Sequence, residues 1–202
     1  SFVHRLAFFA YGDKGDSENA LKSLLELWRL EPTNQTLQAQ LIVELVKINK
    51  PLVAIPIVHT MLTSNPGDPV LLKQKWLLTL NAAQASTDTM ARAGLLAQAM
   101  QAGENMVRAD STKSDSTYFA RQLAAATAAN AWPKAVEYAS RATQKFPNNA
   151  EFWWLRARAE QKVGQSVMMQ QSLARVLTIN PKYPNATVLL AQSWVDMNMP
   201  DS

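Results

Sequence analysis

Two pairs of prolines in this chain repeat the same interval of 34 residues. They close the dipeptides Glu31-Pro32, Asn65-Pro66, Phe146-Pro147 and Asn180-Pro181. Successive prolines are 34, 81 and 34 residues apart. Because proline cannot continue a helix and pushes the preceding residue out of helical geometry, each one marks the end of a structural segment. A fixed period of this length indicates a repeat architecture, in which one segment cannot bury its apolar face alone and must stack on its neighbours.

The segment from Ala150 to Tyr183 shows what one interval encodes. Its apolar residues recur at steps of three and four, at Phe152, Trp153, Ala157, Met169, Leu173, Val176 and Leu177. This spacing is typical of amphipathic helices. Gly164 stands between the two runs and can adopt the left-handed conformation that ends a helix. The segment therefore predicts two antiparallel helices joined by a tight turn.

This pattern resembles the tetratricopeptide repeat (TPR), a helix pair with a period of about 34 residues. The residues that match the family pattern here are Trp153, Ala157, Gly164 and Pro181. Arg156 and Met169 depart from it. A small residue also stands twelve positions before the closing proline in three other segments, at Ala20, Ala54 and Ala135. The resemblance covers essentially the whole chain and implies an all-α, right-handed superhelical solenoid of antiparallel helix pairs.

We expect one solenoid domain over residues 1–202, with five repeats and a last helix. The expected boundaries are 1–34, 35–68, 69–115, 116–149, 150–183 and 184–197. Ser17 is the expected N-cap of the second helix of repeat one, and Pro56 should bend a helix of repeat two. Repeat three is longer than the others. We expect its second helix to take up the insertion with about 22 residues, or about 33 Å of length, starting near Met90.

The resemblance also implies a binding surface, because such solenoids present an extended concave face lined by the first helix of each pair. The residues that this places towards the groove are Arg5, Phe9, Gln40, Val43, Lys73, Gln74, Leu77, Arg121, Ala124, Trp154, Arg158, Lys162 and Gln192. Long basic and amide side chains can bind an extended backbone or carboxylates, and Phe9 and Trp154 can anchor apolar side chains.

Each groove assignment competes with a purely structural interpretation. A solvated helix face explains the arginines and lysines as well, and Trp154 fits the core as well as a ligand site. Trp153 is expected in the core. Trp28, Trp76, Trp132 and Trp194 are expected to pack between helices. One TPR subfamily clamps a C-terminal carboxylate with lysine and asparagine; here Phe9, Ala39 and Val43 cannot supply that clamp, and we do not predict it.

Charge is unevenly distributed along the chain. Residues 116–183 contain nine Lys and Arg against three Asp and Glu, whereas the whole chain has a net charge of +4. A basic face can attract nucleic acid. The basic residues are spread over both helices of each pair, and no RNP, GXXG or zinc pattern accompanies them. The expected partner is therefore a protein or peptide, with self-association as an alternative, and nucleic acid is not favoured.

No catalytic, cofactor or metal site is expected from the sequence. There are no cysteines, and neither His4 nor His59 has a second ligand at helical spacing. None of the common nucleophile, zinc-protease or nucleotide-binding motifs is present. The prediction is a non-catalytic scaffold that binds a protein segment in its groove. Alternatives are a self-associating assembly module, or a recruiting or regulatory arm of an enzyme whose catalytic domain lies elsewhere.

The sequence leaves the compartment open between cytoplasm and periplasm. No run of 18 apolar residues predicts a membrane span. Ser1 to His4 do not start a signal peptide, because no basic, apolar and cleavage pattern follows. The chain is expected to begin inside a first helix and to stop after the first helix of a sixth repeat, which is typical of a fragment of a longer protein.

Overall fold

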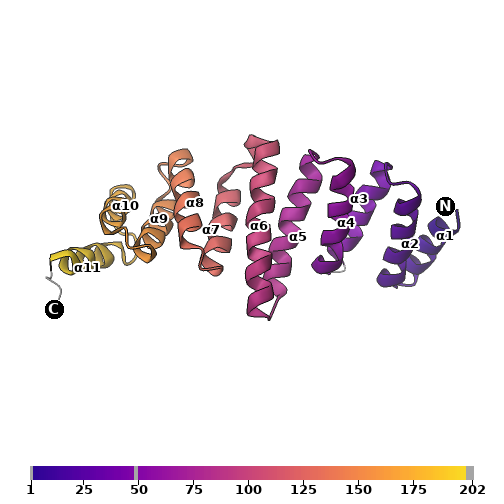
Figure 1. The fold of residues 1–202 in the computed structure, drawn as a ribbon, viewed down its shortest axis with the longest axis horizontal. Helices are drawn as coiled ribbons and strands as arrows, with labels where there is room; N and C mark the ends of the chain where they lie inside the picture. The colour runs from indigo at the N-terminus through magenta and orange to yellow at the C-terminus, as the bar shows by residue number, and fades with distance from the viewer. Residues whose placement is uncertain (1, 48–49, 199–202) are drawn as a thin grey trace. The chain divides into compact units, whose positions relative to one another are not determined.

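The computed structural model describes residues 2–47 and 50–198, and within these ranges it contains eleven α-helices, one short 3₁₀ helix and no strand. The chain forms two compact units, an N-terminal unit from Ser1 to Asp110 and a C-terminal unit from Ser111 to Ser202. Figure 1 shows the helices in chain order. The all-α fold expected from the sequence is confirmed.

The N-terminal unit consists of three helix pairs. Its helices are α1 (Phe2–Asp13), α2 (Ser17–Leu30), α3 (Gln35–Lys47), α4 (Pro51–Ser64), α5 (Pro69–Ala85) and α6 (Thr89–Ala109). Each helix packs against the next one in the chain. This succession of neighbour contacts is what a repeat array requires, because every pair covers the apolar face of the pair before it.

The C-terminal unit is built on the same plan. It contains η1 (Ser111–Lys113), α7 (Ser116–Ala128), α8 (Trp132–Lys145), α9 (Ala150–Lys162), α10 (Ser166–Ile179) and α11 (Ala186–Asn198). Neighbouring helices pack in order from α7 to α11, and α7 also touches α9, so two first helices lie side by side. The last helix begins two residues later than expected. Asn185, with φ of 61°, forms a left-handed turn before it.

Asparagine and aspartate residues start the first helices, a feature that the sequence reasoning missed. Two positions after a closing proline, the side chains of Asn34, Asp68 and Asn149 accept backbone N–H bonds from the first turn of α3, α5 and α9. These bonds satisfy N–H groups that have no partner within the helix. The assignment of Ser17 as a cap is wrong. Asp16 caps α2, because its carboxylate accepts a hydrogen bond from the Asn19 backbone N–H. The bond from the Asn19 side chain, with this backbone bond, holds the pKa of Asp16 below its ordinary value.

The turns between paired helices use the left-handed region. Gly164 has a φ of 75°, as expected, and Gly15 at the corresponding turn of repeat one has a φ of 70°. In repeat four the same position, 34 residues before Gly164, is Asn130, with a φ of 53°. Asparagine tolerates this conformation better than most residues with a Cβ atom. The turn is thus retained although the glycine is not.

The insertion in repeat three lengthens both of its helices. α5 has 17 residues and α6 has 21, close to the 22 expected for the second helix alone. Asp88 caps α6 through the backbone N–H groups of Met90 and Ala91. In repeat two, α4 runs on through Pro56 as one helix.

The core follows the repeat positions. The four residues twelve positions before the closing prolines, Ala20, Ala54, Ala135 and Met169, are all buried. In the C-terminal unit Met169 packs with Ala157, Leu173, Val176 and Ala186, so this larger side chain fills the place that alanine takes elsewhere.

The tryptophans outside α9 divide into two groups. Trp28 and Trp76 are buried, as expected for packing positions. Trp132 is only half-buried. The assignment of Trp194 to packing is wrong, because its side chain is 55% exposed. In α11, Ala186 belongs to the core of the unit, and Leu189 and Leu190 pack against it.

Candidate functional site: two hollows on the first helices

The residues predicted to line a groove lie on α1, α3, α5, α7, α9 and α11, the first helices of their pairs. All of them are exposed or half-buried, including the aromatic Phe9 and Trp154. The structure brings six of these residues together in two hollows, one in each compact unit.

The N-terminal hollow has a volume of about 350 Å³. It is lined by Arg5, Phe8, Phe9, Leu24, Leu27, Asn34, Thr36, Leu37 and Gln40. These residues come from α1, α2, α3 and the turn before α3, so the hollow lies where the first helix pair meets the second. Its floor is apolar, and the rings of Phe8 and Phe9 meet edge to face with centroids 5.4 Å apart.

The cation that lines the N-terminal hollow is paired with a carboxylate that does not itself line it. The Arg5 guanidinium donates to both carboxylate oxygens of Glu31, at 3.4 and 3.3 Å. The Asn34 side-chain amide donates to the same carboxylate at 3.0 Å. Because Arg5 is about half exposed, this ion pair adds little to stability. It does occupy the cation that would otherwise face a ligand.

The C-terminal hollow has a volume of about 340 Å³. It is lined by Thr127, Trp132, Trp154, Leu155, Arg158, Ala159 and Lys162. Thr127 lies at the end of α7, Trp132 at the start of α8, and the others on α9. The turn at Asn130 joins α7 to α8 and so sets the position of Trp132 opposite α9.

Each cation of this hollow lies over an aromatic ring. The Arg158 guanidinium carbon is 5.8 Å from the centre of the Trp154 ring, and the Lys162 ammonium is 5.7 Å from that of Trp132. These are cation–π distances. Among the residues that the structure describes, neither cation has a carboxylate within ion-pair distance. The hollow is therefore both aromatic and uncompensated in charge.

Tyr183 packs against the Trp154 side chain. The two ring centroids are 5.4 Å apart, and the Tyr183 hydroxyl donates to the Glu151 carboxylate. Desolvation, with the Glu151 bond and charge added, raises the pKa of the Tyr183 phenol far above its ordinary value. Tyr183 is a protonated donor at neutral pH, as an ordinary phenol also is, and its ring packs on Trp154.

A buried charged network supports α9 beneath this surface. Glu160 is fully buried and accepts from the Arg156 Nε at 2.8 Å and from the Ser172 hydroxyl at 2.7 Å. Arg156 also donates to the Thr143 hydroxyl at 3.3 Å and lies over the Trp153 ring. Arg156, which departs from the family pattern, therefore has Glu160 as the partner for its charge. The network joins α8, α9 and α10.

Trp153 has a structural role here, in keeping with its expected place in the core, although it is only half-buried. Its indole N–H donates to the Pro147 carbonyl at 2.9 Å, which ties α9 to the turn before it. Trp154, the next residue, lines the hollow instead. Trp154 was open to two interpretations, packing and a ligand site. In the structure it packs on Tyr183 and also lines the hollow.

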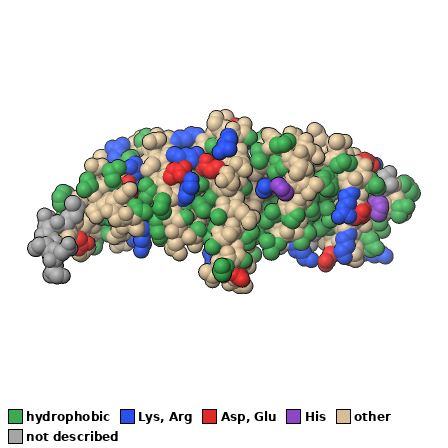
Figure 2. All heavy atoms as spheres, in the orientation of Figure 1, with side chains coloured by type: hydrophobic (Ala, Val, Ile, Leu, Met, Phe, Trp, Pro, Cys, Tyr) green, Lys and Arg blue, Asp and Glu red, His purple; other side chains and the backbone are tan. Residues whose placement is uncertain are grey.

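The other predicted groove residues lie outside both hollows. On α5 and α7, Lys73 and Arg121 are exposed and Gln74 is half-buried. Gln192 on α11 donates to Asp196 at 2.7 Å. The remaining three are Val43, Leu77 and Ala124. Figure 2 shows hydrophobic side chains over much of α4 and α5, and Lys and Arg side chains with some Asp and Glu over α7 and α8.

Besides apolar and small polar lining residues, the groove prediction lacked Trp132 of the C-terminal hollow and Glu31, the partner of Arg5. The position of Trp132 in its repeat predicts packing between helices. It is the first residue of α8, just after the Asn130 turn, and its half-buried side chain lines the hollow. Glu31, next to a closing proline, carries no signal of its own, because its partner Arg5 is 26 residues away.

The part of the chain that the structure describes offers neither a metal centre nor a membrane span. No group of three or more His, Cys, Asp or Glu side chains could hold a metal ion there. None of the described helices has the length and apolarity to cross a bilayer.

Comparison with known proteins identifies the fold. No protein-family model matches the chain, and no curated protein is similar to it in sequence. Among solved structures, a MamA RS-1 double mutant has a TM-score of 0.56 at 14% identity, over 89% of this chain and 93% of that one. MamA from Desulfovibrio magneticus RS-1, from residue 41 onward, has a TM-score of 0.54 at 15% identity, over 90% and 96%. A thermophilic TPR protein from Thermus thermophilus has a TM-score of 0.46 at 16% identity, over 95% and 96%.

The two MamA likenesses, whose TM-scores exceed 0.5, concern the fold alone. Together with the 34-residue period and the helix pairs of each unit, they make this chain a TPR-like helical repeat protein. The expectation drawn from the repeat pattern is confirmed at that level.

Proposed function

We propose that this TPR-like repeat protein is a non-catalytic scaffold that binds a peptide or protein segment on the face formed by its first helices. One observation carries the proposal. Six side chains assigned to that face lie together in two hollows, as Arg5, Phe9 and Gln40 in one and Trp154, Arg158 and Lys162 in the other.

The composition of the hollows suits a polypeptide ligand. Each combines an aromatic side chain with long donors over an apolar floor. An aromatic or aliphatic side chain of a partner can fill such a hollow, while amide and cationic groups bind backbone carbonyls or carboxylates at its edge. Both volumes lie near the lower end of the range for binding pockets, about 300 to 1,000 Å³, which fits one or two side chains.

The same inventory argues for binding without chemistry. A catalytic site needs a nucleophile or acid beside a base, held in mutual hydrogen-bond reach. The linings of the two hollows contain cations, amides, one threonine each and aromatic rings, and no histidine or carboxylate. We therefore propose that the two hollows form a surface that recognises a ligand and does not catalyse a reaction.

A random peptide library displayed on phage and selected on the whole chain tests the proposal. Selected peptides should lose at least about tenfold in affinity on Trp154→Ala or on Phe9→Ala, since an aromatic anchor of an interface is typically worth that much. The matched controls are Leu52→Ala on α4 and Val167→Ala on α10, which are 63% and 55% exposed apolar residues of second helices. If every selected peptide binds both hollow variants as tightly as the parent, the first-helix face is not the binding surface.

Self-association is a second candidate function, favoured by exposed apolar side chains. Met90 at the start of α6 is 86% exposed, and Phe2, Val3 and Leu6 of α1 are each more than half exposed. Light scattering over a wide concentration range tests it. A mass that rises with concentration and falls when residues 86–93 are deleted supports it; one monomer mass at all concentrations contradicts it.

A further inference from the structure

We infer that the C-terminal hollow binds an acidic segment of a partner protein, one with two carboxylate side chains in an acidic–x–acidic pattern next to an apolar or aromatic residue. This inference rests on the proposed function and specifies the ligand of one of its two hollows. The hollow is the one lined by Thr127, Trp132, Trp154, Leu155, Arg158, Ala159 and Lys162.

The charge of the C-terminal hollow favours an acidic ligand. Arg158 and Lys162 are exposed, and neither has a carboxylate partner among the described residues. The surrounding sequence reinforces them, because residues 116–183 contain nine basic against three acidic side chains. One of those three, Glu160, is buried and bound to Arg156. A negative segment is the ligand that complements this surface.

The distance between the two cations matches that between alternate side chains of an extended peptide. Arg158 and Lys162 are four residues apart on α9, which is about 6 Å along a helix axis. An extended segment places alternate side chains on one side, about 6.6 to 7 Å apart. Two carboxylates separated by a single residue can therefore each meet one cation. A single terminal carboxylate would meet only one of them well, so the side chains of an internal segment fit better than a chain end.

Apolar side chains line the hollow beside the two cations. Trp132, Trp154, Leu155 and Ala159 give the hollow an apolar interior of limited volume, about 340 Å³. An apolar or aromatic residue beside the acidic pair can fill it and remove the rings from water. The rings also pre-position the cations, since Arg158 and Lys162 already lie over Trp154 and Trp132.

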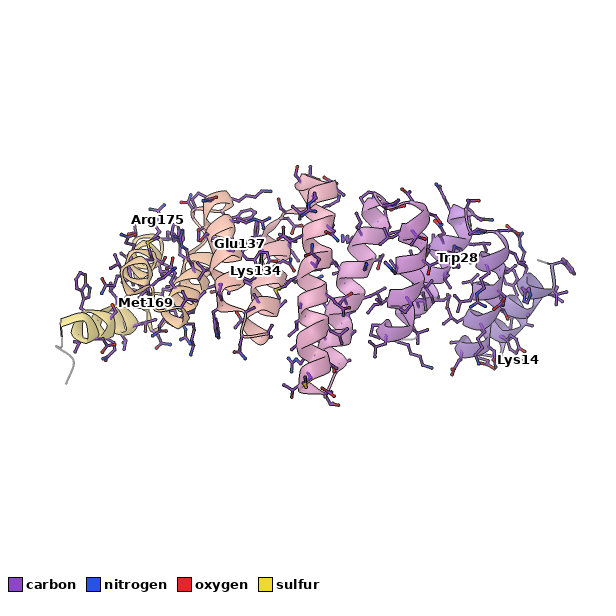
Figure 3. The ribbon with its side chains drawn as sticks, viewed as in Figure 1. Lys14, Trp28, Lys134, Glu137, Met169 and Arg175 are labelled. Atoms are coloured by element: carbon purple, nitrogen blue, oxygen red, sulfur yellow. The ribbon has the colours of Figure 1, made fainter. Side chains whose placement is uncertain are left out.

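The aromatic faces argue against nucleic acid as the ligand. Base stacking needs an open ring face. Trp154 is covered by Arg158 and approached by Tyr183, and Trp132 is covered by Lys162. Phosphate binding along a strand also needs a continuous basic stripe, whereas Lys134 and Arg141 of α8 are paired with Glu137. Figure 3 shows Lys134 and Glu137 close together on that helix.

The test measures binding of labelled peptides to the whole chain by fluorescence anisotropy. The probe is a short, C-terminally amidated peptide with a central Glu-Leu-Glu-Trp sequence. Three further probes are compared with it. The first is the same peptide with both Glu replaced by Gln, the second is the Glu peptide with a free C-terminus, and the third is an oligothymidylate of similar length. We expect the Glu peptide to bind at least about tenfold more tightly than the Gln peptide at low salt, because charge-assisted hydrogen bonds are roughly twice as strong as neutral ones. We expect the amidated and free-acid peptides to bind alike.

A pair of double variants separates the hollow from general charge. Arg158→Gln with Lys162→Gln should weaken the Glu peptide about tenfold and leave the Gln peptide unchanged. Arg175→Gln with Lys182→Gln removes the same two types of charge from the same unit outside the hollow, on α10 and the turn after it, and should change binding by less than about twofold. Figure 3 labels Arg175 on α10.

The inference is overturned by equal affinity for the Glu and Gln peptides, by equal losses in the two double variants, by a free C-terminus that binds about tenfold more tightly, or by tighter binding of the oligothymidylate. Its failure is distinguishable from that of the proposed function. Library peptides that lack acidic residues and still depend on Trp154 would overturn only the inference, whereas the absence of any peptide that depends on Trp154 or Phe9 would overturn both.

Discussion

The two hollows have almost the same volume, about 350 Å³ in the N-terminal unit and about 340 Å³ in the C-terminal unit. They differ in whether their cations are paired with a carboxylate. Arg5 is bound by Glu31, whereas Arg158 and Lys162 face solvent over tryptophan rings. Glu31 stands directly before a closing proline, and the same place in the other repeats is Asn65, Phe146 or Asn180. The cation of the N-terminal hollow is therefore paired with a carboxylate, whereas the two cations of the C-terminal hollow have no carboxylate partner among the described residues.

The hollows also differ in what supports them. The residues beneath the N-terminal hollow are apolar, with Leu24 and Leu27 fully buried. Beneath the C-terminal hollow, α9 is held by the buried Arg156–Glu160 pair. A buried charge with all its bonds made is tolerated, whereas one left alone is costly. The C-terminal hollow should therefore be the more sensitive of the two to a single substitution in its framework.

The largest expected effect comes from Glu160→Ala. It would leave Arg156 partly buried without its carboxylate partner, and it should cost about 3 to 5 kcal/mol of stability in the C-terminal unit. Urea unfolding monitored by amide hydrogen exchange can report each unit separately. Glu137→Ala, which breaks only exposed pairs such as that with Lys134, should cost less than about 1 kcal/mol. Equal losses in both variants would remove the distinction between the two frameworks.

Asn130→Val should come next, with a loss of about 1 to 2 kcal/mol, because a β-branched residue is strained at positive φ. Since this turn sets Trp132 against α9, the variant should also weaken peptide binding at the C-terminal hollow and leave the N-terminal hollow unchanged. Asn130→Gly is the matched control and should stay within about 0.5 kcal/mol of the parent. Thermal unfolding and peptide titration measure the two effects.

Trp132→Ala should lower the affinity of the Glu peptide about fivefold with little change in stability, because the half-buried ring is a wall of the hollow more than part of the core. Trp194→Ala removes the same side chain from an exposed site on α11 and should leave affinity unchanged. The two dissociation constants decide this. An equal loss for both would mean that the peptide does not occupy the assigned hollow.

The smallest expected effect is a gain. Glu31→Gln removes the partner of Arg5 and should make the N-terminal hollow bind the Glu peptide about threefold more tightly, which would bring it closer to its C-terminal counterpart. Arg29 pairs with Glu26 on the exposed face of α2, so Glu26→Gln is the control for an added net charge in the same unit. Anisotropy titrations at low salt detect the change. A gain of the same size in both variants would assign it to net charge.

Periodic features of the sequence predicted the architecture well, and features that depend on distant partners were missed. Closing prolines, turn glycines and apolar spacing are local, so they predicted the helix pairs and the buried alanine positions. The groove set was implied by the family resemblance; six of its residues line the two hollows, and its role in binding stays a prediction. Trp132, Glu31 and the network around Glu160 did not follow, because each depends on a side chain at least 12 residues away. Asn130 was missed for a simpler reason: it takes the backbone conformation of a glycine without being one.

The most direct test of the account follows the indole N–H signals of the six tryptophans by NMR while the Glu peptide is added to the whole chain. The account predicts saturable shifts of the Trp132 and Trp154 signals, with the buried Trp28 and Trp76 signals unmoved. Unchanged signals from Trp132 and Trp154 in the presence of bound peptide would contradict it.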